Sequence, residues 1–69
     1  MGWFGSKWVV VRTESGARVD DIDRLDAIFK SNGMKTKISL EGSSIKRIQV
    51  RKKDVDRAKE LMQIFDDER

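Results

Sequence analysis

Four basic side chains recur at even spacing along two neighbouring segments of the chain. Lys35 and Lys37 belong to the segment MKTKISL, and Arg47 and Arg51 belong to IKRIQVR. In an extended strand, residues at even spacing point to the same face, so each pair presents its cations together. Cations on one sheet face can hold phosphate oxygens, and an aromatic side chain beside them can stack on a base. We interpret this face first as a solvated one whose charge is balanced by acidic helices behind it. The alternative is that these four residues form a polyanion-binding face.

Side chains that carry catalysis are scarce. The chain has no histidine, cysteine or tyrosine, which leaves serine, lysine and carboxylates as nucleophiles and general bases. The aspartates at positions 20, 21 and 23 are expected on the outer faces of a helix, where charge is solvated. We therefore expect no enzymatic activity, no cofactor, no metal site and no disulfide.

Composition and length limit the class of protein. The chain has 69 residues, of which 38% are hydrophobic and 39% charged, as in one small globular domain. Its longest apolar run is the four residues 8–11, against the roughly 18 that a membrane span needs. We expect a cytoplasmic protein without membrane contact. Residues 27–53 carry a net charge of +7, while the segments before and after them are acidic.

The periodicity of apolar residues predicts the elements. Residues 7–13 are rich in β-branched side chains and predict a strand, followed by a loop over 14–17. Apolar residues at steps of three and four predict a helix over 19–32, which Gly33 ends by adopting a positive φ. Alternation predicts strands over 34–40 and 45–51, joined by a turn over 41–44. A second amphipathic helix begins at Asp54, with a stripe of apolar residues: Val55, Ala58, Leu61, Met62 and Phe65.

The element order β-α-β-β-α predicts an α+β fold. A right-handed crossover followed by a hairpin places the third strand between the first two. We expect a ferredoxin-like plait that lacks the fourth strand, with an antiparallel sheet in the order 1-3-2. Both helices would cover one face, and the basic face would be open, with Trp8 or Val9 beside it. The plait would span residues 7–67, between an aromatic segment at 1–6 and an end at 68–69.

The N-terminal aromatic residues lie beside an edge strand. The first strand has no partner on its outer side in this topology, and residues 8–11 are apolar on both faces. A long apolar edge is prone to pair with another chain. We expect a binding surface at Trp3, Phe4, Trp8 and Val10, through which the chain self-associates as a homodimer or contacts another protein. The pattern M-G-x-x-x-S at the start is also that of N-myristoylation, which we do not expect here.

The chain also resembles a family of small bacterial proteins described as signal-transducing and related in fold to the PII-type nitrogen regulators. The resemblance covers residues 8–67 and rests on the segments 21–29, 32–34 and 48–62. It implies a small regulatory module without catalytic residues. Together with the edge strand, it predicts a non-enzymatic module that acts through protein contacts, with polyanion binding as the alternative.

Overall fold

A computed structural model describes residues 7–68 of the chain. The elements are β1 (Trp8–Ser15), α1 (Asp20–Ser31), β2 (Thr36–Glu41), β3 (Ile45–Arg51) and α2 (Val55–Asp67), with a 3₁₀ turn before each helix, at Gly16–Arg18 and Lys52–Asp54. This is the predicted β-α-β-β-α order, and the fold is α+β. The aromatic segment expected at residues 1–6 lies outside the described residues.

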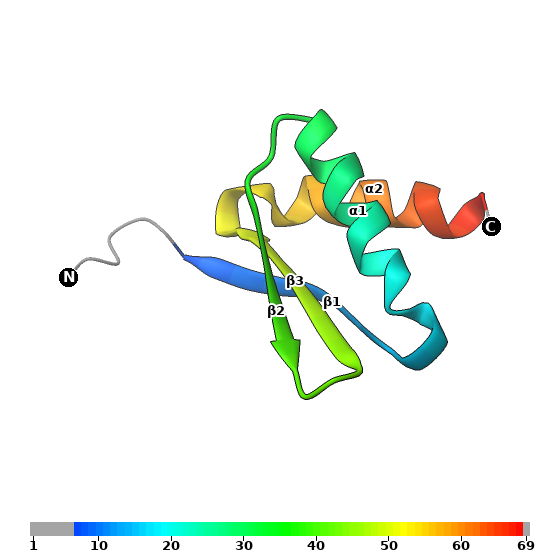
Figure 1. Cartoon of the computed structure of the whole chain (residues 1–69). Helices are drawn as coiled ribbons and strands as arrows, with labels where there is room; N and C mark the ends of the chain where they lie inside the picture. Colours follow the sequence, from blue (N-terminus) through cyan, green and yellow to red (C-terminus); the bar gives the residue numbers. More distant parts are fainter. Residues whose placement is uncertain (1–6, 69) are drawn as a thin grey trace.

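The sheet has three antiparallel strands in the order β1-β3-β2. Both helices lie on one side of it (Figure 1), so the predicted topology is confirmed. Since β3 is central, β1 and β2 are both edge strands in the described part of the chain. A register shift between Val10 and Arg12 marks a bulge in β1. The strand continues to Ser15, two residues beyond the predicted end, because Glu14 and Ser15 pair with Lys46 and Ile45.

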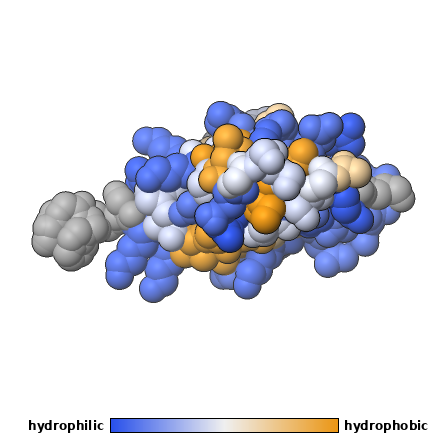
Figure 2. Space-filling view, turned by 60° about the horizontal axis from the view of Figure 1, so that its bottom comes forward, coloured by the Kyte–Doolittle hydropathy of each residue, from blue (hydrophilic) through white to orange (hydrophobic). Residues whose placement is uncertain are grey.

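The core lies between the sheet and the two helices. Ile48 and Val50 of β3 are fully buried under residues from both helices. The buried helical residues are Ile22, Leu25 and Phe29 of α1 and Ala58, Leu61 and Met62 of α2. They follow the predicted apolar stripes. Charged and polar side chains cover most of the face shown in Figure 2. By exposed fraction, the large apolar side chains at the surface of the described residues include Val10, Ile38, Leu40 and Ile64.

One expectation for the first helix is wrong. Asp21 was expected on an outer, solvated face, but it is only 4% exposed. The 3₁₀ turn folds back over the first turn of α1 and brings Arg18 Nε to 3.7 Å from the Asp21 carboxylate. Arg24, one turn further along, lies 3.9 Å from the same carboxylate. The buried charge is thus compensated by two cations from its own neighbourhood in the chain.

The polar residues on the helix-facing side of the sheet are tied to helix carboxylates. Lys46 of β3 forms an ion pair with Asp23 of α1 at 3.0 Å. The Thr36 hydroxyl of β2 donates a hydrogen bond to Asp26, also on α1. These contacts hold α1 against both strands of the hairpin. They also engage Asp23 and Asp26 of α1 on the side of the sheet opposite its open face.

Gly33 ends α1 as predicted, with a φ of 80°. The N–H of Met34 donates to the Phe29 carbonyl and the N–H of Gly33 to the Lys30 carbonyl, both at 3.0 Å, which is the Schellman pattern. Replacing Gly33 with alanine should lower the free energy of unfolding by about 1 kcal/mol, because an L-residue is strained at this φ. Urea unfolding followed by circular dichroism measures this. Gly42→Ala is not a neutral control, since its φ is also positive at 66°; Ala27→Ser on exposed α1 surface is suitable. A Gly33→Ala protein as stable as the parent would contradict the expectation.

Candidate functional site

The sheet face turned away from the helices carries the predicted cations. Val50 and Ile48 are buried against the helices, so the alternation of β3 turns Arg47, Gln49 and Arg51 to the opposite face. Lys37 is directly opposite Gln49 on the adjacent strand and shares that face. Lys35, two residues before Lys37, follows the same alternation just ahead of β2. All four residues of the predicted polyanion-binding face therefore belong to the open side.

Trp8 lies on this open face between two cations. It pairs with Arg51 in the β1–β3 ladder, and the Arg51 guanidinium carbon lies 5.6 Å from the centre of its ring. The Lys37 ammonium, from the other edge of the sheet, lies 5.2 Å from the same centre. Both distances are within cation–π range. The sequence left the choice between Trp8 and Val9 open; the register selects Trp8, because Val9 pairs with the buried Val50.

Six cations that form no ion pair within residues 7–68 lie at the end of the sheet where β1 and β2 begin and β3 ends, and two of them, Lys37 and Arg51, contact the Trp8 ring. We call this group the basic end; it consists of Lys7, Lys35, Lys37, Arg51, Lys52 and Lys53. The backbone N–H of Lys52 donates a hydrogen bond to the Lys7 carbonyl at 3.0 Å. This bond places Lys7, the first residue of the group along the chain, beside Lys52 near its other end. In the described part of the chain, every other lysine and arginine except Lys59 has a carboxylate within ion-pair distance.

An open cavity of about 710 Å³ lies at the basic end. It is lined by Lys7, Arg51, Lys52, Lys53 and Asp56, so one carboxylate stands among four cations. The Arg51 Nε atom is buried and has no hydrogen-bond partner among residues 7–68. A buried donor without an acceptor is unfavourable, and an anionic oxygen is the acceptor that best matches a guanidinium.

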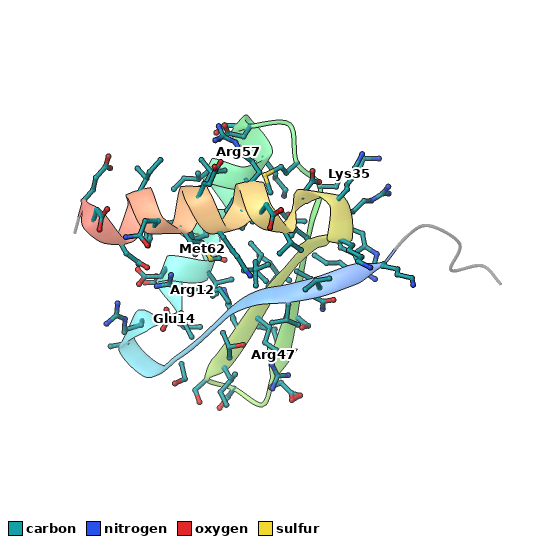
Figure 3. The ribbon with its side chains drawn as sticks, turned by 180° about the vertical axis from the view of Figure 1, so that it is seen from behind. Arg12, Glu14, Lys35, Arg47, Arg57 and Met62 are labelled. Atoms are coloured by element: carbon teal, nitrogen blue, oxygen red, sulfur yellow. The ribbon has the colours of Figure 1, made fainter. Side chains whose placement is uncertain are left out.

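The structure separates Arg47 from the other predicted cations. Arg47 forms an ion pair with Glu41 at 3.0 Å, near the turn of the hairpin. In Figure 3, Lys35 and Arg47 lie at opposite ends of the sheet, with Lys35 on the side where α2 begins. Three of the four predicted residues therefore share the basic end, and Arg47 is both distant from it and neutralised.

Sequence reasoning missed three members of the basic end. Lys7, Lys52 and Lys53 lie just outside the alternating segments, so a pattern of strand faces does not include them. The adjacent pair Lys52–Lys53 directly after a strand was the available signal. Of the residues predicted to bind a protein partner, Trp3 and Phe4 lie outside the described residues. Trp8 and Val10 share the open face, and Val10 is 46% exposed.

No family model matches the chain, and neither curated proteins nor solved structures gave a significant match. Within residues 7–68, no group of three or more acidic side chains is placed to hold a metal ion. The helices described for those residues are too short or too polar to cross a bilayer. The inference of function therefore depends on the geometry of the open face and its basic end.

Proposed function

We propose that this chain is a non-catalytic binding module whose ligand is single-stranded nucleic acid, held at the basic end. The observation that carries the proposal is the position of the Trp8 ring between Lys37 and Arg51, at the end of the sheet that holds the other described cations without an ion pair. Aromatic rings that stack on bases, next to cations that contact the phosphate backbone, are the usual means by which proteins bind single strands. The regular, base-paired geometry of a duplex would offer no exposed base for Trp8 to stack on.

Stacking of a base on Trp8 would replace one of its two cation–π contacts. Such a contact contributes about 0.5–1 kcal/mol at an exposed site, and stacking of a base on an aromatic ring about 1–3 kcal/mol. The exchange is favourable. The displaced Lys37 or Arg51 would then be available to a phosphate. The same side chain would thus contact the Trp8 ring in the free chain and a phosphate in the complex.

The unpaired state of these cations favours a polyanion. An arginine or lysine already paired with a carboxylate must break that contact before it binds phosphate, whereas the cations of the basic end form no ion pair with a described carboxylate that would have to be broken. For single strands, the logarithm of the binding constant falls with the logarithm of salt concentration by about 0.7 per phosphate contacted. Binding at the basic end should therefore weaken steeply as salt is raised.

We expect Trp8→Ala and Lys37→Glu each to weaken binding of a labelled oligothymidine or oligouridine by about ten-fold, as measured by fluorescence polarisation at low salt. The first variant removes the stacking ring, and the second reverses a charge beside it. Circular dichroism of each variant checks that the fold is retained. The salt dependence of the parent chain, measured in the same assay, should have the negative slope expected for contacts with phosphates.

Lys59→Glu is the matched control, because Lys59 is the unpaired cation outside the basic end among the described residues. It changes net charge as Lys37→Glu does and should leave binding nearly unchanged. Arg47→Glu should have a smaller effect than Lys37→Glu, since Arg47 is paired with Glu41. Equal weakening by Lys59→Glu and Lys37→Glu would mean attraction by net charge alone. That result, or no binding at low salt, would overturn the proposal.

Protein contact through β1 is the second candidate. β1 is an edge strand, and its Val10 is 46% exposed beside Trp8 on the open face. These observations fit the predicted self-association and the regulatory role implied by the family resemblance. The bulge between Val10 and Arg12 counts against it, because bulges twist an edge strand away from regular pairing. A Val10→Lys variant tests this candidate in the association experiment below.

A further inference from the structure

Within residues 7–68 no strand pairs with the outer side of β2, the other edge strand, which carries two exposed apolar residues. Ile38 is 38% and Leu40 66% exposed, although both belong to the helix-facing side of the sheet. Figure 1 shows the reason: the hairpin turn projects away from α2, so this end of the sheet is not covered. Exposed apolar side chains on a regular edge strand invite pairing with another strand.

The segment Lys37–Glu41 reads KISLE, which is complementary to itself about Ser39. If a second copy of β2 runs antiparallel with Ser39 opposite the partner's Ser39, Ile38 faces the partner's Leu40. In the same register Lys37 faces the partner's Glu41, which also forms an ion pair with Arg47 of its own chain at 3.0 Å. The apolar pairs lie on the helix-facing side and the charge pairs on the open side, each occurring twice because of the two-fold symmetry.

We propose that two copies of this chain associate through β2, antiparallel and in the register centred on Ser39. The strand that pairs with the outer edge of β2 is thus β2 of a second copy. The evidence for this partner is that the charges of Lys37 and Glu41 are complementary when two copies of the segment run antiparallel. A two-fold axis perpendicular to the sheet keeps the helices of both copies on one side. The two sheets become continuous, and both basic ends belong to the same open face. The inference concerns association of the free chain and does not rest on the proposed function.

Other registers that keep the faces aligned are less complementary. Shifting the centre to Ile38 pairs Ile38 with the partner's Ile38 and Glu41 with the partner's Lys35, but it places Leu40 opposite the partner's Thr36. Shifting the centre to Leu40 pairs the two Leu40 side chains and places Ile38 opposite the partner's Gly42. Both shifts also place Lys37 opposite a serine of the partner, without a carboxylate. β1 offers no comparable symmetry, since its pairing is interrupted by the bulge before Arg12.

Charge reversal with rescue tests the register. Lys37→Glu places like charges opposite each other at two positions, and so does Glu41→Lys. Cross-strand charge pairs each alter the stability of strand pairing modestly, so each single variant should weaken dimerisation by about ten-fold. The double variant Lys37→Glu/Glu41→Lys restores opposite charges and should recover most of the parent's association. The readout is the solution mass by sedimentation equilibrium, without nucleic acid, from roughly 10 μM to 1 mM, where a small interface is measurable.

Two further variants separate the edges. Leu40→Lys should abolish the dimer while leaving the fold intact, because this side chain is 66% exposed. Val10→Lys, on the open face of β1, should leave the dimer unchanged.

A monomer over the whole concentration range would overturn the inference, as would loss of association in Val10→Lys but not in Leu40→Lys. Rescue of Glu41→Lys by Lys35→Glu rather than by Lys37→Glu would exclude the register centred on Ser39. Oligonucleotide binding measured on the Leu40→Lys monomer keeps the two proposals distinguishable.

Discussion

Replacing Phe29 with alanine should lower the free energy of unfolding by about 3–5 kcal/mol, the largest loss expected for a single side chain of this fold. Phe29 is completely buried and is the largest of the fully buried side chains. Truncating a buried phenylalanine costs about 3–5 kcal/mol, because apolar transfer energy is lost and a cavity remains. A domain of this size has a total stability of only about 3–10 kcal/mol, at roughly 0.05–0.15 kcal/mol per residue. One side chain therefore accounts for a large share of the stability.

Urea unfolding followed by circular dichroism measures this loss, with Ile64→Ala as the matched control. Ile64 is on α2 but is 51% exposed, so its truncation should change the free energy of unfolding by about 0.5 kcal/mol or less. A loss below about 1.5 kcal/mol for Phe29→Ala would mean that the core collapses around the missing ring. In that case the packing of α1 on the sheet is less well defined than the structure has it.

Replacing Arg12 with alanine should lower the free energy of unfolding by about 2 kcal/mol, which is large for a residue outside the core. Arg12 Nε donates to Glu14 at 2.8 Å, and its two terminal nitrogens donate to both oxygens of Asp66 on α2 at 3.0 Å. Only 17% of the Arg12 side chain and 15% of the Glu14 side chain are exposed. The substitution would remove the 2.8 Å partner of the largely buried Glu14 carboxylate and leave it Arg18, whose Nε lies 3.8 Å away. The contact with Asp66 contributes less, because Asp66 is 45% exposed.

Two variants isolate the geometry of the Arg12 contacts. Arg12→Lys keeps the charge but cannot form the fork to Asp66, so it should recover only part of the loss. Arg57→Ala removes an exposed ion pair with Glu60 and should cost less than about 0.5 kcal/mol. If Arg12→Ala and Arg57→Ala have equal effects in urea unfolding, the Arg12 cluster contributes no more than an ordinary surface pair.

The hydrogen bonds to Asp66 and Glu14 raise the pKa of Arg12 above its ordinary value. A cation whose pKa is raised on folding stabilises the fold at every pH below its unfolded pKa. This contribution is lost only as the pH rises through the folded pKa. The stabilisation due to the charge on Arg12 itself should therefore be constant through neutral and moderately alkaline pH.

Arg12 also shows where sequence alternation stops being reliable. Strict alternation from Val9, which faces the helices, would place Arg12 on the open face with Trp8 and Val10. The bulge between Val10 and Arg12 shifts the phase, so Arg12 reaches α2 instead. A bulge adds one residue to one strand, and a pattern of hydrophobic and polar residues does not reveal it. Had Arg12 remained on the open face, it would have been one more cation beside the basic end.

The sequence by itself determined the order and type of the elements, the strand order 1-3-2 and the core. The periods of a helix and a strand differ. Apolar residues at steps of three and four up to Phe29 therefore indicate a helix, and the alternation around Ile48 indicates a strand. Gly33 could be assigned because few other residues tolerate its φ. These properties depend on neighbours in the chain, which a sequence displays directly.

Only the tertiary structure decided which charges meet. The strand register places Trp8 beside Arg51 and brings Lys37 to the same ring from the far edge of the sheet. The same packing pairs Arg12 with Asp66 and Lys46 with Asp23. Electrostatic contacts form between residues distant in sequence, over a few ångströms, so a single shift in register changes every partner. For that reason the chain predicts a basic face, and its fold concentrates the unpaired charge at one end of that face.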